Sequence, residues 1–263
     1  MNQLIALLLF PGIASWTVLL LVYRVLVMET RTLPPLTGWR NADGLLALLA
    51  LLGALTGMLL LPWPLHPLAI PPVGELALIW FVIEVAFVMP VLPALLAPAP
   101  LARRAAIREL QLGSAGRAVV WLAIGALGAG VWQAAALGVV GRVLALLAVA
   151  LALPAALGIG PFASERSIAP LGTASGLAED TGQLGELARA ACGAVLLVAV
   201  LIYAIGPLPF ALPLVLVLFV LCCLGLRRLG RGLPRLVLPR ALNWCLWRAL
   251  PLALVGFVLT VLG

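Results

Sequence analysis

The chain alternates between long apolar stretches and short connections that hold nearly all of its charged residues. A helix of about 20 residues crosses a hydrocarbon core of ~30 Å, so apolar stretches near that length predict membrane spans. Eight stretches qualify, the sixth and seventh being divided only by a short turn at Gly206-Pro207. They are Leu4–Val27, Gly44–Leu61, Leu76–Leu96, Ala118–Leu137, Val143–Ile159, Ala188–Ile205, Leu208–Leu226 and Leu246–Leu262. The pattern predicts an all-α membrane protein, a bundle of about eight transmembrane helices forming one polytopic domain over residues 1–263.

The connections between these spans differ in charge. Numbered from the N-terminus, the odd connections and the span ends beside them hold fifteen of the sixteen arginines, and only Arg142 falls in an even connection. No lysine occurs, so arginine alone carries the excess of positive residues that marks cytoplasmic loops. We therefore expect periplasmic N- and C-termini in a multi-pass protein of the cytoplasmic (inner) membrane. Leu4–Val27 has no positive residue before it, which predicts a retained helix and not a cleaved secretory signal.

Composition narrows the function classes. With 65% hydrophobic residues, 10% charged residues and a mean hydropathy of +1.24, the chain lacks the polar surface of a soluble protein. The arginines that give the chain its net charge of +7 lie beside apolar spans, where they would meet anionic lipid headgroups. We therefore expect no nucleic-acid partner. The four cysteines lack metal-ligand spacing, and the sole histidine, His66, lacks partners for catalysis, so no metal site is expected. Without a nucleophile or phosphate-binding motif, the chain is not expected to catalyse a reaction alone.

Glu84 is the only carboxylate inside a predicted span, near the middle of Leu76–Leu96. A charged group there costs at least ~2.5 kcal/mol on insertion scales, so Glu84 is expected to be protonated or paired. Two interpretations are balanced. Glu84 either relays protons inside the bundle, or is a neutral acid hydrogen-bonded to a neighbouring helix.

Two connections carry further polar groups. The fifth holds four carboxylates, which would form an acidic entrance or a docking surface: Glu165, Glu179, Asp180 and Glu186. A solvated loop would contain the same residues, and this simpler interpretation is favoured from the residues alone. The third connection, Ala102–Leu110, places Arg104 and Arg108 four residues apart, which predicts a short amphipathic helix on the membrane surface.

The end of the chain carries a more specific pattern. Arg231-Gly232-Leu233-Pro234-Arg235 is followed by Trp244, by Trp247-Arg248 and by Leu250-Pro251-Leu252-Ala253-Leu254. This order resembles the last cytoplasmic loop and last helix of one membrane component of NADH-quinone oxidoreductase, the component that joins the two arms of respiratory complex I. It equally resembles the counterparts of that component in membrane-bound hydrogenases and formate hydrogenlyase. Family members usually have eight helices and an external N-terminus.

Two shorter runs extend the resemblance along the chain. Ala106-Ile107-Arg108-Glu109-Leu110-Gln111-Leu112-Gly113 looks like a third-loop run of the hydrogenase-type members, and Glu179-Asp180-Thr181-Gly182 looks like the element that closes the fifth loop. The chain departs from the family in lacking the Pro-Phe-Asp run of the fifth loop and the Arg-Gly-Pro repeats of the first. These departures leave quinone binding open. The Arg108-Glu109 run and the missing first-loop elements slightly favour the hydrogenase or formate hydrogenlyase branch over the quinone branch.

The resemblance implies a non-catalytic membrane subunit that anchors a cytoplasmic redox module and couples electron transfer to proton or ion translocation. It implies no cofactor in this chain, iron-sulfur clusters in hydrophilic partner subunits, and antiporter-like membrane subunits beside it. The residues expected to carry proton or ion coupling are Glu84, Asp43, Glu165, Glu179, Asp180 and Glu186. Those expected to dock the partner or lipid are Arg104, Arg108, Glu109, Arg231 and Arg235.

Two other functions fit the same sequence. A stand-alone ion or small-molecule transporter would use Glu84 as its site. A membrane anchor that has lost coupling would fit the short loops.

Overall fold

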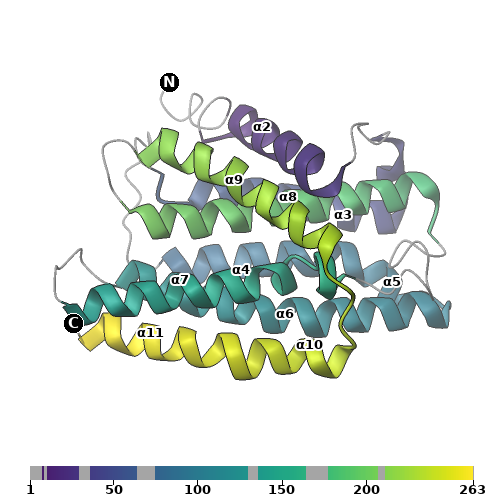
Figure 1. Cartoon of the computed structure of the whole chain (residues 1–263). Coiled ribbons are helices and arrows are strands. Elements are labelled where there is room, and N and C mark those ends of the chain that lie inside the picture. Colours follow the sequence, from purple (N-terminus) through teal and green to yellow (C-terminus); the bar gives the residue numbers. More distant parts are fainter. Residues whose placement is uncertain are drawn as a thin grey trace.

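The computed structural model of the chain describes residue 8 and residues 11–29, 36–63, 75–129, 136–163, 177–206 and 211–262. Within these residues the chain is helical and forms no strand, and its long helices run roughly along one direction as a bundle (Figure 1). Seven helical segments of this part are long and apolar enough to cross a membrane, and an eighth, Ile13–Met28, is apolar but shorter. The prediction of an all-helical bundle suited to a membrane is confirmed.

Successive spans of the bundle run antiparallel, and some spans consist of two or three helical elements that continue one another. In chain order the helical elements are α2 (Ile13–Tyr23), η1 (Arg24–Met28), η2 (Leu36–Arg40), α3 (Ala42–Leu60), α4 (Glu75–Val88), η3 (Met89–Val91), α5 (Leu92–Leu96), α6 (Pro100–Ala129), α7 (Ala136–Ala156), η4 (Gly160–Phe162), α8 (Glu179–Ile205), α9 (Ala211–Gly232), α10 (Leu238–Trp244), η6 (Cys245–Ala249) and α11 (Leu250–Leu262). Two of these, η1 and η6, are single π-helical turns.

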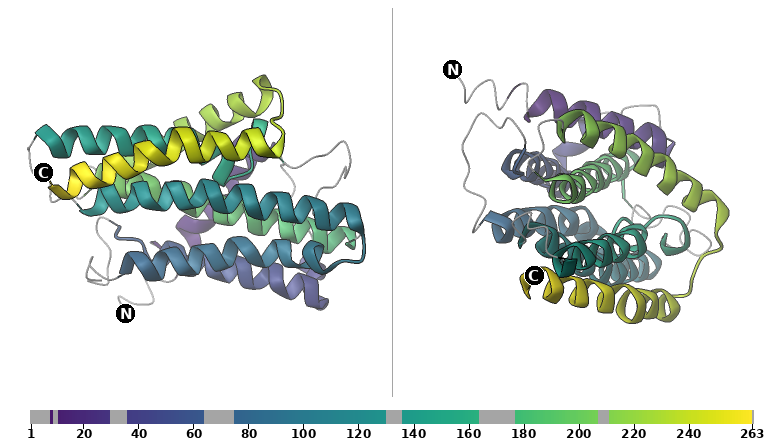
Figure 2. Two further views of the ribbon diagram at one scale, coloured as in Figure 1. Left: turned by 90° about the horizontal axis from the view of Figure 1, so that it is seen from below. Right: turned by 60° about the vertical axis from the view of Figure 1, so that its left-hand side comes forward.

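Helix α8 lies at the centre of the bundle. It packs against α3 most closely and also against α9, α6, α4 and α2, and nearly every residue of it from Thr181 onward is buried. On the far side of α6, the helices α7 and α11 complete a second group that α6 joins to α8 (Figure 2). A helix that is apolar all round belongs in such a central position.

Helix α6 corrects two of the predicted boundaries. The sequence predicted a separate surface helix at Ala102–Leu110 and a span that begins at Ala118, yet a single helix runs from Pro100 to Ala129. No proline interrupts the chain between Leu101 and Ala129, so the backbone continues as a helix through its arginines. Arg117, which the predicted boundary placed in a connection, therefore lies within a long helix.

Small residues bring the helices close together. Ala47, Ala50 and Ala54 are buried on α3, where their small side chains allow close contact with neighbouring helices. One close crossing is between α7 and α11, where a Cβ atom on Gly141 would lie 2.8 Å from the Gly256 carbonyl oxygen. Only glycine permits that approach.

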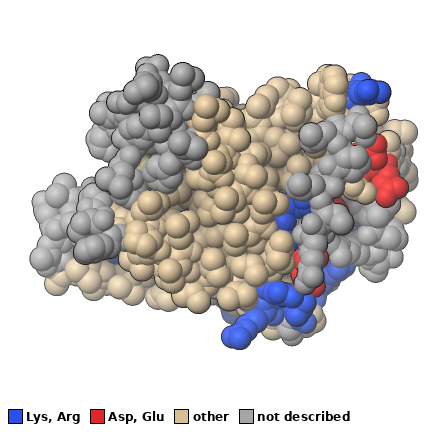
Figure 3. Space-filling view, turned by 90° about the horizontal axis from the view of Figure 1, so that it is seen from above, with Lys and Arg blue, Asp and Glu red and all other residues tan. Residues whose placement is uncertain are grey.

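Charged residues gather at one end of the molecule. α3, α6, α8 and α10 begin at this end and α9 finishes there (Figure 1). In Figure 3, arginine and acidic side chains occupy this end of the face shown, while the middle of that face carries neither. We call it the arginine-bearing end.

Candidate functional site

A buried ion pair joins α4 to α6. The Arg117 Nε donates to both carboxylate oxygens of Glu84, each at 2.9 Å, and only 5% of the Arg117 side chain and 21% of the Glu84 side chain are exposed. A charge inside an apolar bundle is tolerated when an opposite charge and hydrogen bonds compensate for lost water. Of the two states expected for Glu84, protonated or paired, the structure has the paired one.

Three further side chains fix this pair. The indole Nε1 of Trp121 donates to Glu84 Oε1 at 3.0 Å, and the second guanidinium nitrogen of Arg117 donates to Ser114 Oγ at 3.3 Å. The Arg117 guanidinium carbon also lies 4.4 Å from the centre of the Phe87 ring, a cation–π contact. Ser114, Arg117 and Trp121 are spaced three and four residues apart, so one face of α6 presents all three to Glu84.

A cavity of about 650 Å³ lies beside this pair at the arginine-bearing end. Residues from η1, α6, the end of α7, α8, the end of α9 and the α9–α10 connection line it. Arg117 and Phe87 are among them, so the ion pair lies at the cavity wall. The volume is typical of a small-molecule site.

The lining is rich in charge. It contains six arginines, Arg108, Arg117, Arg189, Arg227, Arg231 and Arg235, and three glutamates, Glu29, Glu109 and Glu186. Three ion pairs within it link elements far apart in sequence: Arg189 contacts Glu109 at 3.9 Å, and Glu29 contacts both Arg227 and Arg231. These contacts tie α8 to α6 and η1 to α9.

Glu29 has an unusual backbone. It directly follows the π-helical turn η1 with φ 60° and ψ 16°, in the left-handed region, and its N–H bonds the Arg24 carbonyl. A glutamate is rarely found in this conformation, which costs about 1–2 kcal/mol relative to a right-handed one. The turn directs the Glu29 carboxylate to α9, where Arg227 Nε donates to it at 3.2 Å.

Arg108 holds the α9–α10 connection against the cavity. Its terminal nitrogen donates to the Leu236 carbonyl at 2.7 Å, and the Leu236 N–H donates to the Pro161 carbonyl at 2.8 Å. Arg108 is 8% exposed, and its buried Nε has no hydrogen-bond partner among the residues that the structure describes. The same connection brings Arg235 to the cavity wall.

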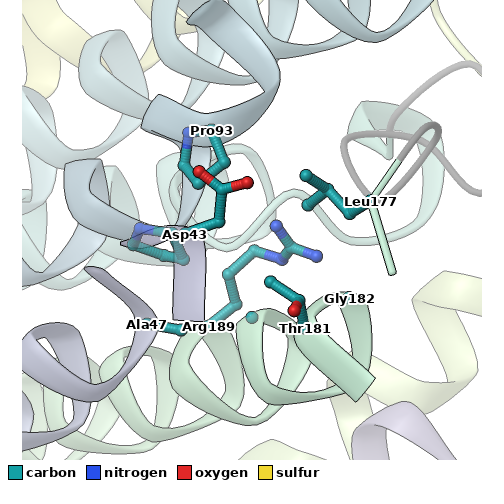
Figure 4. Close-up of a pocket in the computed structure, with 9 residues that line it drawn as sticks. Asp43, Ala47, Pro93, Leu177, Thr181, Gly182 and Arg189 are labelled. Atoms are coloured by element: carbon teal, nitrogen blue, oxygen red, sulfur yellow. The ribbon is translucent and has the colours of Figure 1, made fainter. Parts of the chain in front are cut away.

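A second, water-sized pocket lies between α3 and α8. It has a volume of about 10 Å³ and is lined by Asp43, Thr181 and Arg189 among others. Figure 4 shows the Asp43 and Arg189 side chains extending toward one another across it. The buried Thr181 hydroxyl has no hydrogen-bond partner within the described chain, and a space of this size suits one ordered water molecule.

The structure brings together some of the residues expected to act and separates others. Arg108, Glu109, Glu186, Arg231 and Arg235 all line the large cavity, which Glu84 reaches through Arg117. Asp43 lines the small pocket, and Arg104 is exposed on α6 outside both. Glu179 and Asp180 occupy the first turn of α8, where the helix dipole favours acidic groups, and line neither cavity. Glu165 lies outside the described residues.

Sequence reasoning missed several residues of this site, and Arg117 and Glu29 are the most informative of them. Arg117 was treated as a loop arginine, although the proline-free run of α6 was a signal that the helix continues past it. Glu29 was assigned no role, because nothing local to it points to α9, whose Arg227 is 198 positions away.

No group of histidine, cysteine and acidic residues able to hold a metal occurs among the described residues. The four cysteines are free thiols, and Cys192, Cys223 and Cys245 are fully buried. No known family model and no curated protein matches the chain.

The arrangement suits movement of charge better than covalent chemistry. A carboxylate held by one guanidinium can take up a proton if that guanidinium moves away, and the cavity gives room and opposite charges for such a movement.

Proposed function

We propose that the chain is an integral membrane subunit of a complex I-like oxidoreductase of the energy-converting hydrogenase or formate hydrogenlyase type. It anchors a cytoplasmic redox module and couples electron transfer to proton or ion translocation. The observation that carries the proposal is the Glu84–Arg117 pair, a largely buried, hydrogen-bonded charge pair at the wall of a charge-lined cavity. Polar and charged residues this deep in an apolar bundle mark ion and proton paths.

The proposed topology has eight crossings, with Ile13–Met28 as the first and both termini in the periplasm. The arginine-bearing end then faces the cytoplasm of a cell whose inner membrane holds the protein. In the sequence, fifteen of the sixteen arginines fall in the odd connections or the span ends beside them, which supports this orientation.

In the proposed assembly, the residues at the arginine-bearing end contact hydrophilic subunits with iron-sulfur clusters. Arg104 is exposed there and available to a partner. Arg231 lines the cavity and contacts Glu29, and its side chain is also exposed. The chain itself binds no cofactor in this proposal. A quinone that occupies the cavity would belong to the quinone branch of the family.

The proposed coupling path runs from the cavity to Glu84. Arg117 alternates between Glu84 and the cavity, where Glu109 and Glu186 offer other carboxylates. Each change of partner would let Glu84 gain or lose a proton.

Two experiments test the proposal. Purification in mild detergent should bring iron-sulfur proteins with the chain, and a stand-alone transporter would purify without them. In vesicles that contain the purified assembly, Glu84→Gln and the double variant Glu179→Gln with Asp180→Asn should impair redox-driven proton pumping per assembled complex. Glu84→Gln also leaves Arg117 without its carboxylate and lowers stability, whereas the double variant should leave assembly intact. Wild-type pumping in both variants would remove the coupling role and leave an anchor without coupling.

A stand-alone ion or small-molecule transporter is the second candidate. The cavity of about 650 Å³ beside Glu84 favours it, because a transported solute needs such a chamber. Uptake by vesicles that contain this polypeptide alone would establish it.

A further inference from the structure

The charges in the large cavity do not balance. Its lining carries six arginines and three glutamates. The described ion pairs account for four of the arginines: Glu84 holds Arg117, Glu109 holds Arg189, and Glu29 holds Arg227 and Arg231. Arg108 and Arg235 have no carboxylate partner within the described residues.

Arg108 is the more informative of these two arginines. It is more than nine-tenths buried, one of its nitrogens is occupied by the Leu236 carbonyl, and its Nε has no hydrogen-bond partner in the part of the chain that the structure describes. A carbonyl oxygen does not neutralise a guanidinium. A buried positive charge of this kind is stabilised by an anion.

The hydrogen bond from Arg108 to Leu236 also positions Arg235. It holds the extended connection from Gly232 to Leu238, which crosses from α9 to α10 on the rim of the bundle (Figure 2). Two guanidinium groups from different parts of the chain thus meet one cavity. Paired guanidinium groups bind phosphate and carboxylate oxygens with strong, charge-assisted hydrogen bonds.

The rest of the lining is apolar. Met28, Leu112, Ile159 and Phe162 contribute to it, and so does Leu233, which is 51% exposed at the edge of the cavity. Next along the rim, Val237 is 57% exposed. A small soluble anion would leave this apolar surface exposed to water, whereas the acyl chains of a lipid would cover it.

We propose that this cavity binds the anionic phosphate headgroup of a membrane phospholipid through Arg108 and Arg235, with the acyl chains leaving along Leu233 and Val237. Basic pockets between transmembrane helices on the cytoplasmic side are suited to anionic headgroups, and anionic lipid is abundant in that leaflet. The inference depends on the cavity and its charges and not on the redox partner, so it stands or falls separately from the proposed function.

The test uses the full chain, with any subunits that co-purify, stripped of lipid in mild detergent. The thermal unfolding midpoint is measured with phosphatidylglycerol, with phosphatidylcholine of the same acyl chains, and with inorganic phosphate. Native mass spectrometry counts bound phospholipid. We expect phosphatidylglycerol alone to raise the midpoint and to remain bound.

Variants link the effect to the cavity. Arg108→Gln and Arg235→Gln should each weaken phosphatidylglycerol binding roughly tenfold, the effect of losing one charge-assisted hydrogen bond. Arg228→Gln is the matched control, because it removes the same charge from the exposed end of α9 without touching the cavity. If Arg108→Gln does not fold, Arg235→Gln keeps the test valid, since Arg235 is exposed.

Three results would overturn the assignment. Equal stabilisation by phosphatidylcholine would show that the headgroup charge is irrelevant. Equal weakening by Arg228→Gln would indicate attraction to the surface as a whole. Full stabilisation by inorganic phosphate would identify a soluble phosphate ligand in place of a lipid.

Discussion

At the scale of single residues, Glu84 and Arg117 stabilise the bundle only as a pair. Each charge alone would cost ~2.5–3.5 kcal/mol at the centre of a membrane helix on insertion scales. Together they compensate each other's charge, and Trp121 donates to Glu84 while Ser114 accepts from Arg117. Losing one partner is therefore expected to be worse than losing both.

The Arg117→Met variant tests this pairing. It leaves the Glu84 carboxylate without its cation, and we expect a loss of about 3–5 kcal/mol in the free energy of unfolding, as for other broken buried pairs. Adding Glu84→Gln to Arg117→Met should restore much of that loss, because the uncompensated charge is then gone. Unfolding in mixed detergent micelles, with wild type and Arg228→Gln as references, measures both. Additive losses in the double variant would contradict a mutually dependent pair.

Glu29 combines two opposing contributions. Its left-handed backbone is unfavourable for a residue with a side chain, while its carboxylate contacts Arg227 and Arg231. Glu29 is 44% exposed, so these contacts contribute less than about 1 kcal/mol each. The backbone cost and the ion pairs are then of similar size.

Two substitutions at position 29 separate these contributions. Glu29→Gln removes the charge and keeps the strained backbone, so it should lower the free energy of unfolding by up to about 1 kcal/mol. Glu29→Gly removes the charge but relieves the backbone, so it should be closer to wild type than Glu29→Gln. The same detergent unfolding assay compares them. A glycine variant less stable than the glutamine variant would show that the turn is not strained.

At the scale of helices, the α7–α11 crossing depends on the absence of side chains. Without a hydrophobic driving force between helices in lipid, close packing supplies the attraction. Gly141 and Gly256 lie against each other here: a Cβ on either would come within 2.8 Å of the carbonyl oxygen of the other. The two backbones must separate if either glycine gains a methyl group.

Gly141→Ala is expected to destabilise the bundle by about 1–3 kcal/mol, the usual cost of overpacking. Gly225→Ala on α9 is the matched control, because an added Cβ there meets no atom within 4 Å. The control should leave the unfolding midpoint nearly unchanged or slightly raised. An equal loss in both variants would show that the effect does not come from the α7–α11 contact.

Hydropathy predicted where helices occur better than where they end. Seven predicted spans overlap helices long enough to cross a membrane, since a run of about 20 apolar residues has few other structures open to it. Hydropathy placed the starts of α6 and α8 too late, at Ala118 and Ala188. Both helices begin earlier, in polar segments whose mean hydropathy is too low to indicate a membrane span. Arg108 and Arg117, which lie in the N-terminal extension of α6, line the large cavity.

The candidate site was only partly predictable for the same reason. Glu84 stood out because a lone carboxylate inside an apolar span needs compensation wherever the helix packs. Its partner, 33 positions away, could not be read from the sequence, because the contact depends on how α4 packs against α6. The Glu29 contact with α9 is still less predictable. It also needs a left-handed backbone turn, and the residue in that turn is a glutamate and not the glycine that would indicate such a turn in a sequence.

At the scale of the whole molecule, the orientation in the membrane decides whether the charged cavity opens to the cytoplasm or to the periplasm. α9 ends at the arginine-bearing end, and α11 runs back to the opposite end of the bundle (Figure 1). A cytoplasmic redox module can reach the cavity only if the arginine-bearing end is cytoplasmic. The arginine asymmetry predicts that it is.

Single-cysteine labelling measures this orientation directly. The four native thiols are first replaced by serine or alanine, and a cysteine is introduced as Arg228→Cys at the end of α9 or as Leu262→Cys, 73% exposed, at the end of α11. With a membrane-impermeant maleimide, the cysteine at position 262 should react in intact cells. The cysteine at position 228 should react only after the membrane is permeabilised.

The two labels act as controls for each other, because both sites are exposed and are expected to face opposite sides of the membrane. Reaction of position 228 in intact cells would place the cavity in the periplasm, where no cytoplasmic module could dock, and the proposed function would have to be abandoned.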